Sequence, residues 1–300
     1  MFGFGSYVRV AMEYEGTVIR PPSEAHSILL QATLGCSHNK CAFCGAYKDK
    51  RFRVRDPEAL SRDLDFAVTH CKRQRRVFLC DGDALILPQK KLIALLDEIR
   101  TKLPWVTRVS TYGNAKALVR KSLEELGELR EAGLRVVYMG LESGDDVTLA
   151  AMNKASTVET MIREGRKCRK AGLKLNVTVL LGLAGPERSR EHAEATGKAL
   201  TAMDPEYAAA LTLMLIPGTP LFGRHEAGEF TLLDSTAMLA ELRAMLAATH
   251  MSRGQFFANH ASNYLPLVVR MPSGKEAALE RIDQALAGEV ELTPEGLRRL

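Results

Sequence analysis

Three cysteines lie close together near the start of the chain, within the segment GCSHNKCAFCG of residues 35–45. Cys36, Cys41 and Cys44 can converge on one metal centre without a distant loop folding over them, because the spacing between them is short. Three protein ligands leave one coordination position open, and metal-centred chemistry takes place at open positions. The stretch therefore predicts a catalytic rather than a structural metal centre.

Zinc and an iron–sulfur cluster are the two centres considered for these thiols. A structural zinc site has four protein ligands, usually supplied as two pairs. Only Cys41 and Cys44 form such a pair, although His38 could serve as a fourth ligand. The other three cysteines are isolated in the sequence: Cys71, Cys80 and Cys168. This distribution is not a disulfide framework, and it favours a reducing compartment and an iron–sulfur cluster with one open iron.

The elements that position the cysteines follow a regular plan. An apolar segment, residues 27–34, precedes them and has the composition of a strand. Five more strand-like segments alternate with helical patterns: residues 76–80, 107–112, 135–139, 174–181 and 207–216. Such alternation predicts right-handed βαβ units and a parallel sheet. We expect an α/β fold, a partial (β/α)6 TIM-like barrel of parallel strands over residues 27–220.

Flanking segments differ from the barrel pattern. Residues 1–26 mix Gly, Pro and charges and are expected to form an irregular lead-in. Helical patterns over residues 232–250 and 274–286 predict a mainly helical C-terminal extension, residues 221–300, that covers the barrel opening.

Residues suited to chemistry follow the predicted strands at their C-terminal ends, where a barrel of this type builds its active site. They are Gly82, Asp83, Ala84, Tyr112, Glu142, Ser143 and Gly182. The basic run of residues 48–55 is either a solvated loop or a source of cations for an anionic cluster or substrate.

With this pattern, residues 25–220 resemble the radical S-adenosylmethionine (SAM) enzymes. Most members carry C-x3-C-x2-C, whereas the first gap here contains four residues. Phe43, the aromatic residue before the third cysteine, matches the family. The chain most resembles the branch of the Elongator catalytic subunit and the oxygen-independent coproporphyrinogen dehydrogenases. It also resembles an uncharacterised bacterial group with GCSHNKC near the start and NHASNYLPL near the end.

The resemblance implies a [4Fe-4S] cluster on the three cysteines, with SAM bound at the open iron. It implies reductive SAM cleavage to a 5′-deoxyadenosyl radical that abstracts hydrogen from a small or peptidyl substrate. A one-electron reductant such as flavodoxin or ferredoxin would supply the electron. Two alternatives are a haem chaperone without turnover and a variant that transfers the 3-amino-3-carboxypropyl group of SAM. RNA modification is a third.

The resemblance also assigns SAM contacts by position. Phe43 would pack near the adenine, and Gly82, Asp83 and Ala84 would meet the amino group. Glu142 and Ser143 follow strand four, and Gly182 ends strand five, as in relatives. At the position of Lys154 relatives have an Arg, and the SAM carboxylate would lie near this side chain. At the position of Thr178 relatives have an acidic residue, and the ribose would lie near it. Each has a structural alternative: Asp83 a helix N-cap, Lys154 an exposed cation, Thr178 a strand former, and Tyr112 a core residue.

A polar and aromatic cluster in the extension is the candidate for substrate recognition. It consists of Asn259, His260, Asn263 and Tyr264. Burying such hydrogen-bonding groups without partners is costly, so they require either a ligand or a structural network.

Composition and sequence pattern argue against a nucleic-acid-binding, a secreted or a membrane-spanning protein. The formal net charge is +5, too small to argue for nucleic acid. Residues 1–10 lack the pattern of a signal peptide, and we see no run of ~18 apolar residues that could span a bilayer. A cytoplasmic protein is expected. A second cluster motif is not apparent, which argues against methylthiotransferase chemistry.

Overall fold

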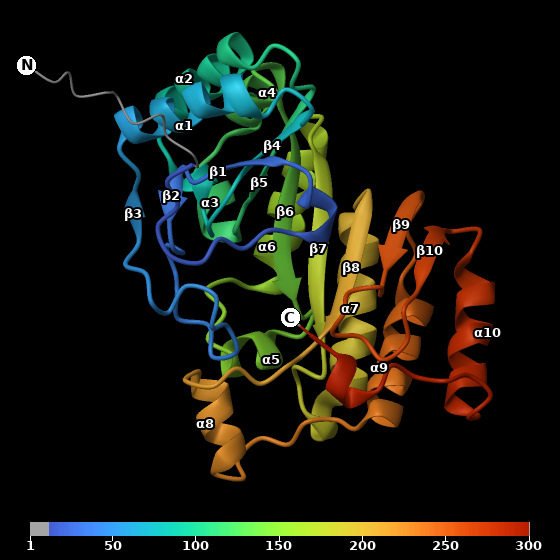
Figure 1. Ribbon diagram of the computed structural model, residues 1–300. Helices are drawn as coiled ribbons and strands as arrows, with labels where there is room; N and C mark the ends of the chain where they lie inside the picture. Colours follow the sequence, from blue (N-terminus) through green and yellow to red (C-terminus); the bar gives the residue numbers. More distant parts are fainter. Residues whose placement is uncertain (1–11, 300) are drawn as a thin grey trace, which may run out of the picture.

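The computed structural model describes residues 12–299 (Figure 1). Within this range, one sheet has the strand order β1-β4-β5-β6-β7-β8-β9-β10. Neighbouring strands from β1 to β9 are parallel, and β10 is antiparallel to β9. The strands are β1 (Ile28–Leu30), β4 (Arg76–Leu79), β5 (Arg108–Tyr112), β6 (Leu134–Glu142), β7 (Lys174–Leu181), β8 (Tyr207–Thr212), β9 (Gly254–Phe257) and β10 (Val268–Met271).

The strands β1 and β4 to β8 follow the chain in order, which confirms the expected α/β fold with a partial barrel. The first predicted strand is shorter than expected. It breaks at Gln31, where Ala32 N donates to Leu30 O at 3.1 Å, and continues as β2 (Thr33–Leu34). Strand β2 pairs with β3 (Arg53–Val54), so the predicted basic loop contains a short strand.

Long helices form a layer on the outer face of the sheet (Figure 1). They are α1 (Pro57–His70), α2 (Gln89–Lys102), α4 (Leu123–Glu131), α6 (Val158–Lys170), α7 (Ser189–Met203), α9 (Ser235–Ala248) and α10 (Lys275–Leu286). The shorter helices are α3 (Ala115–Val119), α5 (Asp146–Ala151) and α8 (Pro220–Glu226), with 3-10 turns η1 (Pro22–Glu24), η2 (Ala84–Ile86), η3 (Pro186–Arg188) and η4 (Glu295–Leu297).

Local sequence signals explain where helices begin and end. Asp56 caps α1 by accepting a hydrogen bond from Glu58 N, and Ser122 with Glu125 forms a complete capping box on α4. Gly133 and Gly172 follow α4 and α6 with positive φ of 122° and 81°. These boundaries agree with the sequence pattern.

The barrel interior is closed at the N-terminal ends of the strands. Within the barrel, Phe78, Tyr112 and Tyr138 pack edge-to-face, with ring centroids 5.0 to 6.1 Å apart. Below them lies Glu24 of the lead-in, which is fully buried. Its Oε1 accepts hydrogen bonds from Tyr138 Oη at 2.6 Å and Arg108 Nη2 at 2.7 Å. The lead-in thus seals one end and leaves the other for the site.

The C-terminal extension is not wholly helical. The expected helices are present as α9 and α10, but β9 and β10 extend the sheet beyond β8. Strand β9 is only four residues long, so its pattern was too short to identify from the sequence. Helix α9 packs on α7, and both helices belong to the main core together with the barrel.

No helix within residues 12–299 is long and apolar enough to cross a membrane. The expectation that residues 1–10 lack a signal peptide concerns a segment outside the described range.

Candidate active site

The three cysteines lie on the connection between β2 and β3, at the C-terminal end of β1. We refer to residues 35–50 as the cysteine loop. The thiols of Cys36, Cys41 and Cys44 are free, and each residue is partly exposed. Burial raises the pKa of Cys41 to about 11 and also raises that of Cys44, although nearby Lys154 opposes both shifts. The neighbouring Cys44 and Cys36 also raise the pKa of Cys41.

Among the described residues, no three His, Cys, Asp or Glu side chains converge closely enough to hold a single metal ion. Ligands of one tetrahedral zinc ion lie within about 4 Å of one another. A cluster presents its iron atoms at separate corners, so its thiolate ligands stand further apart. His38 Nε2 donates instead to Asn153 O at 2.7 Å. Three free thiols that leave one coordination position open suit an iron–sulfur cluster with one open iron.

Asn39 shapes the four-residue gap between the first two cysteines. Its φ is 45°, in the left-handed region that Asn tolerates better than most residues. Its Nδ2 donates to Tyr47 O at 2.6 Å and also to Lys50 O at 3.4 Å, which closes the loop. Sequence reasoning did not single out Asn39, since only the backbone angle reveals its role.

Asp81 anchors the cysteine loop to the end of β4. Its side chain is buried and its φ is 62°. The Oδ2 atom accepts hydrogen bonds from Gly35 N at 2.9 Å and from Gln31 Nε2 at 3.2 Å, and it pairs with Lys50 Nζ at 3.0 Å. The basic run thus supplies a cation to the base of the site. Asp81 is a positioning residue that was not among the predicted site residues, although it lies two residues before the predicted Asp83.

The loop after β4 contacts the cysteines directly. A Cβ on Gly82 would come within 2.8 Å of Cys36 Cβ, so only glycine permits this approach. Asp83 accepts a hydrogen bond from Ser37 Oγ, while its other carboxylate oxygen is buried and makes no hydrogen bond of good geometry among the described residues. Burial raises the pKa of Asp83, although the nearby Ser37 and Asn114 side chains oppose the shift. An unsatisfied carboxylate beside the cysteine loop is suited to an ammonium group.

Ala84 differs from expectation in its surroundings, whereas Asp83 does not. Ala84 is fully buried in the main core, so its side chain packs rather than faces the site. Asp83 precedes η2 but makes no side-chain capping hydrogen bond to it, which excludes the structural alternative for this residue.

A second charged group arrives from the end of β6. Lys154 Nζ and Glu142 Oε1 form an ion pair of 3.0 Å that folds over Gly140. Burial lowers the pKa of Lys154, but Glu142 and Cys41 outweigh it, so the net shift is upward. Lys154 is therefore a charged group close to the thiols, not an exposed surface cation.

Helix α5 connects this pair to the cysteine loop. Ala42 N donates to Met152 O at 2.9 Å, and Asn153 Nδ2 donates to Lys40 O at 3.0 Å. Both contacts join residues more than 100 positions apart in the chain. The loop is therefore fixed from β4 on one side and from the end of α5 on the other.

A buried network supports the ends of β6 and β7. Ser143 Oγ donates to His192 Nδ1 at 2.7 Å, and His192 Nε2 donates to Leu180 O at 3.0 Å. Glu241 of α9 accepts from Gly182 N at 2.6 Å and lies 3.5 Å from His192 Nε2. Burial lowers the pKa of His192 to about 4 and raises that of Glu241 to about 7.

This network reassigns two predicted site residues. Ser143 is buried and directed toward His192, away from the cysteines. A Cβ on Gly182 would come within 2.3 Å of Met238, so its open side faces α9. Both residues hold the strand ends in place. His192 and Glu241 were not identified from the sequence, because their partners are distant in the chain.

The remaining residues predicted to contact SAM are Phe43, Thr178 and Tyr112, and each lies in a different environment. Phe43 packs against an apolar cluster that includes Leu183 and Leu213. Thr178 is partly exposed and lies beside Gly140 in the strand register, near the Glu142–Lys154 pair. Tyr112 belongs to the interior aromatic cluster, and burial raises its pKa.

Three of the four candidate substrate residues make structural hydrogen bonds to neighbouring segments. Asn263 is buried, donating to Ala210 O and accepting from Thr212 Oγ1, both at 2.8 Å. His260 Nδ1 bonds Ser262 Oγ at 2.9 Å. Their hydrogen bonds bind the loop after β9 to the end of β8.

The chain's last turns complete this arrangement. Tyr264 Oη donates to Glu295 Oε2 at 2.6 Å, and the Arg298 guanidinium stacks 4.0 Å from the Tyr264 ring centroid. Asn259 is exposed and has no side-chain hydrogen bond within the described range. The structural alternative thus accounts for Asn263 and Tyr264.

Four of the five non-glycine residues with positive φ in the described chain lie at this site or its support: Asn39, Asp81, Glu142 and Asn153. Such conformations are costly and gather at functional sites. Their concentration around the cysteine loop marks the C-terminal end of the barrel as the functional end.

Comparisons with known proteins bear on the family and the fold of this chain. An uncharacterized protein of Methanocaldococcus jannaschii is 25% identical over 217 residues, which cover 69% of this chain and 66% of that protein. A cobalamin- and [4Fe-4S]-bound radical SAM methyltransferase structure from Kitasatospora setae matches with a TM-score of 0.50 at 20% identity, covering 64% of this chain and 38% of that one.

Coproporphyrinogen III oxidase from Escherichia coli, described as a radical SAM enzyme, matches with a TM-score of 0.53 at 17% identity. The match covers 74% of this chain and 53% of that one. The chain thus spans less than two thirds of each of these relatives. The structural matches establish a shared fold. The family model of the radical SAM superfamily matches residues 30–200, and the chain therefore belongs to the radical SAM superfamily.

Proposed function

We propose that this enzyme holds a [4Fe-4S] cluster on Cys36, Cys41 and Cys44 and cleaves SAM reductively to abstract hydrogen from a substrate. One observation carries the proposal. Three free thiols, an unsatisfied carboxylate and an ion pair meet at the C-terminal end of one barrel, although they come from separate strands. When bound, the cluster and SAM together supply a 5′-deoxyadenosyl radical.

The chain's own residues would bind and orient SAM. Asp83 would accept hydrogen bonds from the SAM ammonium group through its unsatisfied oxygen. Lys154 would attract the carboxylate, while Glu142 keeps Lys154 in place. Phe43 and Thr178 would contact the adenine and ribose. Each contact restricts the motion of SAM, and holding reactants in position is the protein's main contribution here.

An acidic one-electron carrier, such as flavodoxin or ferredoxin, is the proposed reductant. Lys40, Lys48 and Arg51 are exposed around the cysteine loop. A basic rim attracts an acidic partner and speeds its association. Within the superfamily we infer kinship with the coproporphyrinogen dehydrogenase and Elongator branch. The motifs of residues 35–41 and 259–267 support kinship with the uncharacterised bacterial group that carries them.

The test is anaerobic reconstitution, followed by iron analysis and SAM cleavage with dithionite. We expect about four irons per chain, lost when Cys36, Cys41 or Cys44 is replaced by Ala. Cys71→Ala is the matched control, since Cys71 lies at the end of α1 and should leave iron content unchanged. One zinc per chain without iron would refute the proposal.

The products distinguish the proposed reaction from its alternatives. 5′-Deoxyadenosine is expected, whereas methylthioadenosine would indicate transfer of the aminocarboxypropyl group instead. Stoichiometric haem binding without SAM cleavage would indicate a chaperone.

A further inference from the structure

A pocket with a volume of about 550 Å³ lies at the opposite end of the sheet from the cysteine loop. It is bounded by the last turns of α6 and α7, the segment before β9 and the start of α10. Glu206 and Arg253 directly precede β8 and β9, which places the pocket beside the N-terminal ends of these strands. The pocket is therefore separate from the candidate active site.

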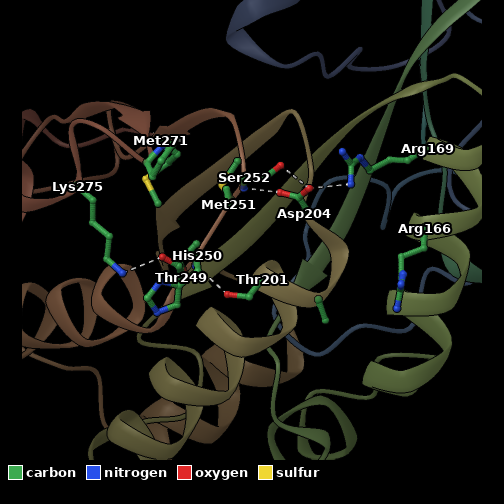
Figure 2. A pocket seen from close by; sticks show the side chains of 12 residues that line it. Arg166, Arg169, Thr201, Asp204, Thr249, His250, Met251, Ser252, Met271 and Lys275 are labelled. Atoms are coloured by element: carbon green, nitrogen blue, oxygen red, sulfur yellow. Dashed lines mark hydrogen bonds and ion pairs between the residues drawn. The ribbon is translucent and has the colours of Figure 1, made fainter.

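Cations outnumber carboxylates in its lining. Figure 2 shows Arg166 and Arg169 entering from α6 and Lys275 from the other side, with Asp204 between them. Asp204 is already satisfied, since it accepts from Ser252 N and Ser252 Oγ at 2.7 Å and from Arg169 Nη1 at 3.1 Å. Arg169 also pairs with Glu206 Oε1 at 3.3 Å, so Arg166 and Lys275 are the cations of the lining that form no ion pair within the described residues.

Two of these cations also serve the fold. Arg169 Nη1 lies 3.4 Å from Met203 O at the end of α7. Lys275 Nζ donates to Ala247 O at 2.6 Å and Thr249 O at 3.0 Å, which satisfies carbonyls at the end of α9. Lys275 is 8% exposed, and its ammonium has a third hydrogen that these two bonds do not use.

Arg166 is the cation that the fold leaves without an assigned role. Its side chain is exposed and makes no hydrogen bond or ion pair with any residue of the described range. The His250 ring likewise has no such contact within residues 12–299, and Figure 2 places it between Lys275 and Thr201. Unpartnered donors thus approach the pocket from opposite walls.

We propose that this pocket binds the phosphate group of a small organic molecule. Guanidinium and ammonium groups are the usual partners of phosphate oxygens, and several donors around one space suit a tetrahedral oxyanion. Met251, Met271 and Pro272 complete the lining and offer apolar contact to the organic part. A volume of about 550 Å³ exceeds that of a bare phosphate and falls within the range of ligand sites.

The test is isothermal titration of the reconstituted protein with phenyl phosphate at low salt, with SAM present in excess to fill the candidate active site. We expect one phenyl phosphate per chain, and at least about tenfold weaker binding for Arg166→Glu. Arg190→Glu on α7 is the control, since it makes the same charge change away from the pocket. It should alter affinity by less than about twofold.

Inorganic phosphate should bind more weakly than phenyl phosphate, because it lacks the group that contacts the apolar lining. Equal affinity for the two would overturn the organic part of the proposal. Equal weakening by both arginine variants, or absence of saturable binding at millimolar ligand, would overturn the site itself. Circular dichroism of each variant confirms folding. The titration measures phenyl phosphate binding and not SAM cleavage, so its outcome is distinguishable from that of the proposed reaction.

Discussion

At the scale of single residues, the site depends on backbone conformations that side chains rarely adopt. Asn39, Asp81 and Glu142 all have positive φ, between 45° and 63°. Each also makes a side-chain contact that compensates the strain: to loop carbonyls, to Gly35 N and to Lys154, respectively. Replacement of such a residue removes both the conformational tolerance and the contact.

Asn39→Val should lose most of its iron after reconstitution, because a β-branched residue in the left-handed region costs roughly 1–2 kcal/mol or more. Asn39→Gly is the matched control, since glycine adopts this φ without strain but lacks the two hydrogen bonds. We expect Asn39→Gly to retain the larger share of iron. Equal iron content in both variants would show that the conformation of Asn39 does not matter.

Lys154→Met should weaken SAM binding to the reconstituted protein by at least about tenfold, since it removes a charge-assisted contact worth roughly 1.5–3 kcal/mol. Lys154→Arg should restore most of the affinity, because it keeps the charge beside Glu142. Calorimetric titration with SAM measures the affinity of each variant. Unchanged affinity in Lys154→Met would assign Lys154 a purely structural role.

At the scale of elements, helix α9 reaches from the extension to the strand ends of the barrel. Glu241 accepts hydrogen bonds from Gly182 N and from Ser189 Oγ, the latter at 2.5 Å. Its neighbour His192 holds Ser143, the residue after Glu142. The position of Glu142 thus depends on a helix nearly 100 residues later in the chain.

The burial of Glu241 makes the stability of the fold depend on pH. Burial raises the pKa of Glu241 from 4.5 to about 7. A carboxyl group with a raised folded-state pKa binds more protons when folded, so the free energy of unfolding falls as pH rises from about 4.5 to about 7. The loss amounts to about 3 kcal/mol, at 1.36 kcal/mol per pKa unit.

Glu241→Gln should remove this slope, because glutamine does not titrate and still accepts from Gly182 N. Urea unfolding of both proteins at pH 5 and pH 8 measures the difference. We expect the wild-type protein to lose more stability than the variant between these two pH values. His192 acts in the other direction: its lowered pKa of about 4 destabilises the fold below pH 6.5. Parallel pH profiles would contradict the assignment to Glu241.

At the scale of the whole molecule, the barrel and the C-terminal extension form one structure. Strand β9 pairs with β8, and the core contains residues of α9 and α10 together with those of β1 and β4 to β8. The tail returns to the loop after β9, where Thr293 N donates to Tyr264 O at 2.8 Å. Figure 1 shows the extension continuing the sheet rather than standing apart from it.

Removing residues 221–300 should therefore prevent soluble folding, because it exposes the β8 edge and uncovers the α7 face that α9 packs against. A shorter deletion, of residues 289–300, is the control. It removes the tail contacts to Tyr264 but leaves β9, β10 and α10 intact. Size-exclusion chromatography and circular dichroism distinguish the two. A soluble, cooperatively unfolding fragment of residues 1–220 would show that the barrel folds alone.

The sequence by itself determined the features that depend on neighbouring residues. The spacing of Cys36, Cys41 and Cys44 identified the metal-binding segment, and strand–helix alternation predicted the parallel barrel. Helix boundaries such as the capping box of Ser122 were predictable for the same reason. Since parallel strands align their C-terminal ends, the general location of the site followed as well.

Tertiary structure decided what joins distant parts of the chain. The sequence pattern did not indicate that Glu241 would accept a hydrogen bond from Gly182 or that Met152 would accept one from Ala42. It also did not indicate that β9 would extend the sheet. The roles of Ser143 and Asn263 also depended on partners about 50 residues away. A side chain's type fixes which bonds it can make, but packing selects the partner, because burial leaves each polar group only the neighbours that the fold brings to it.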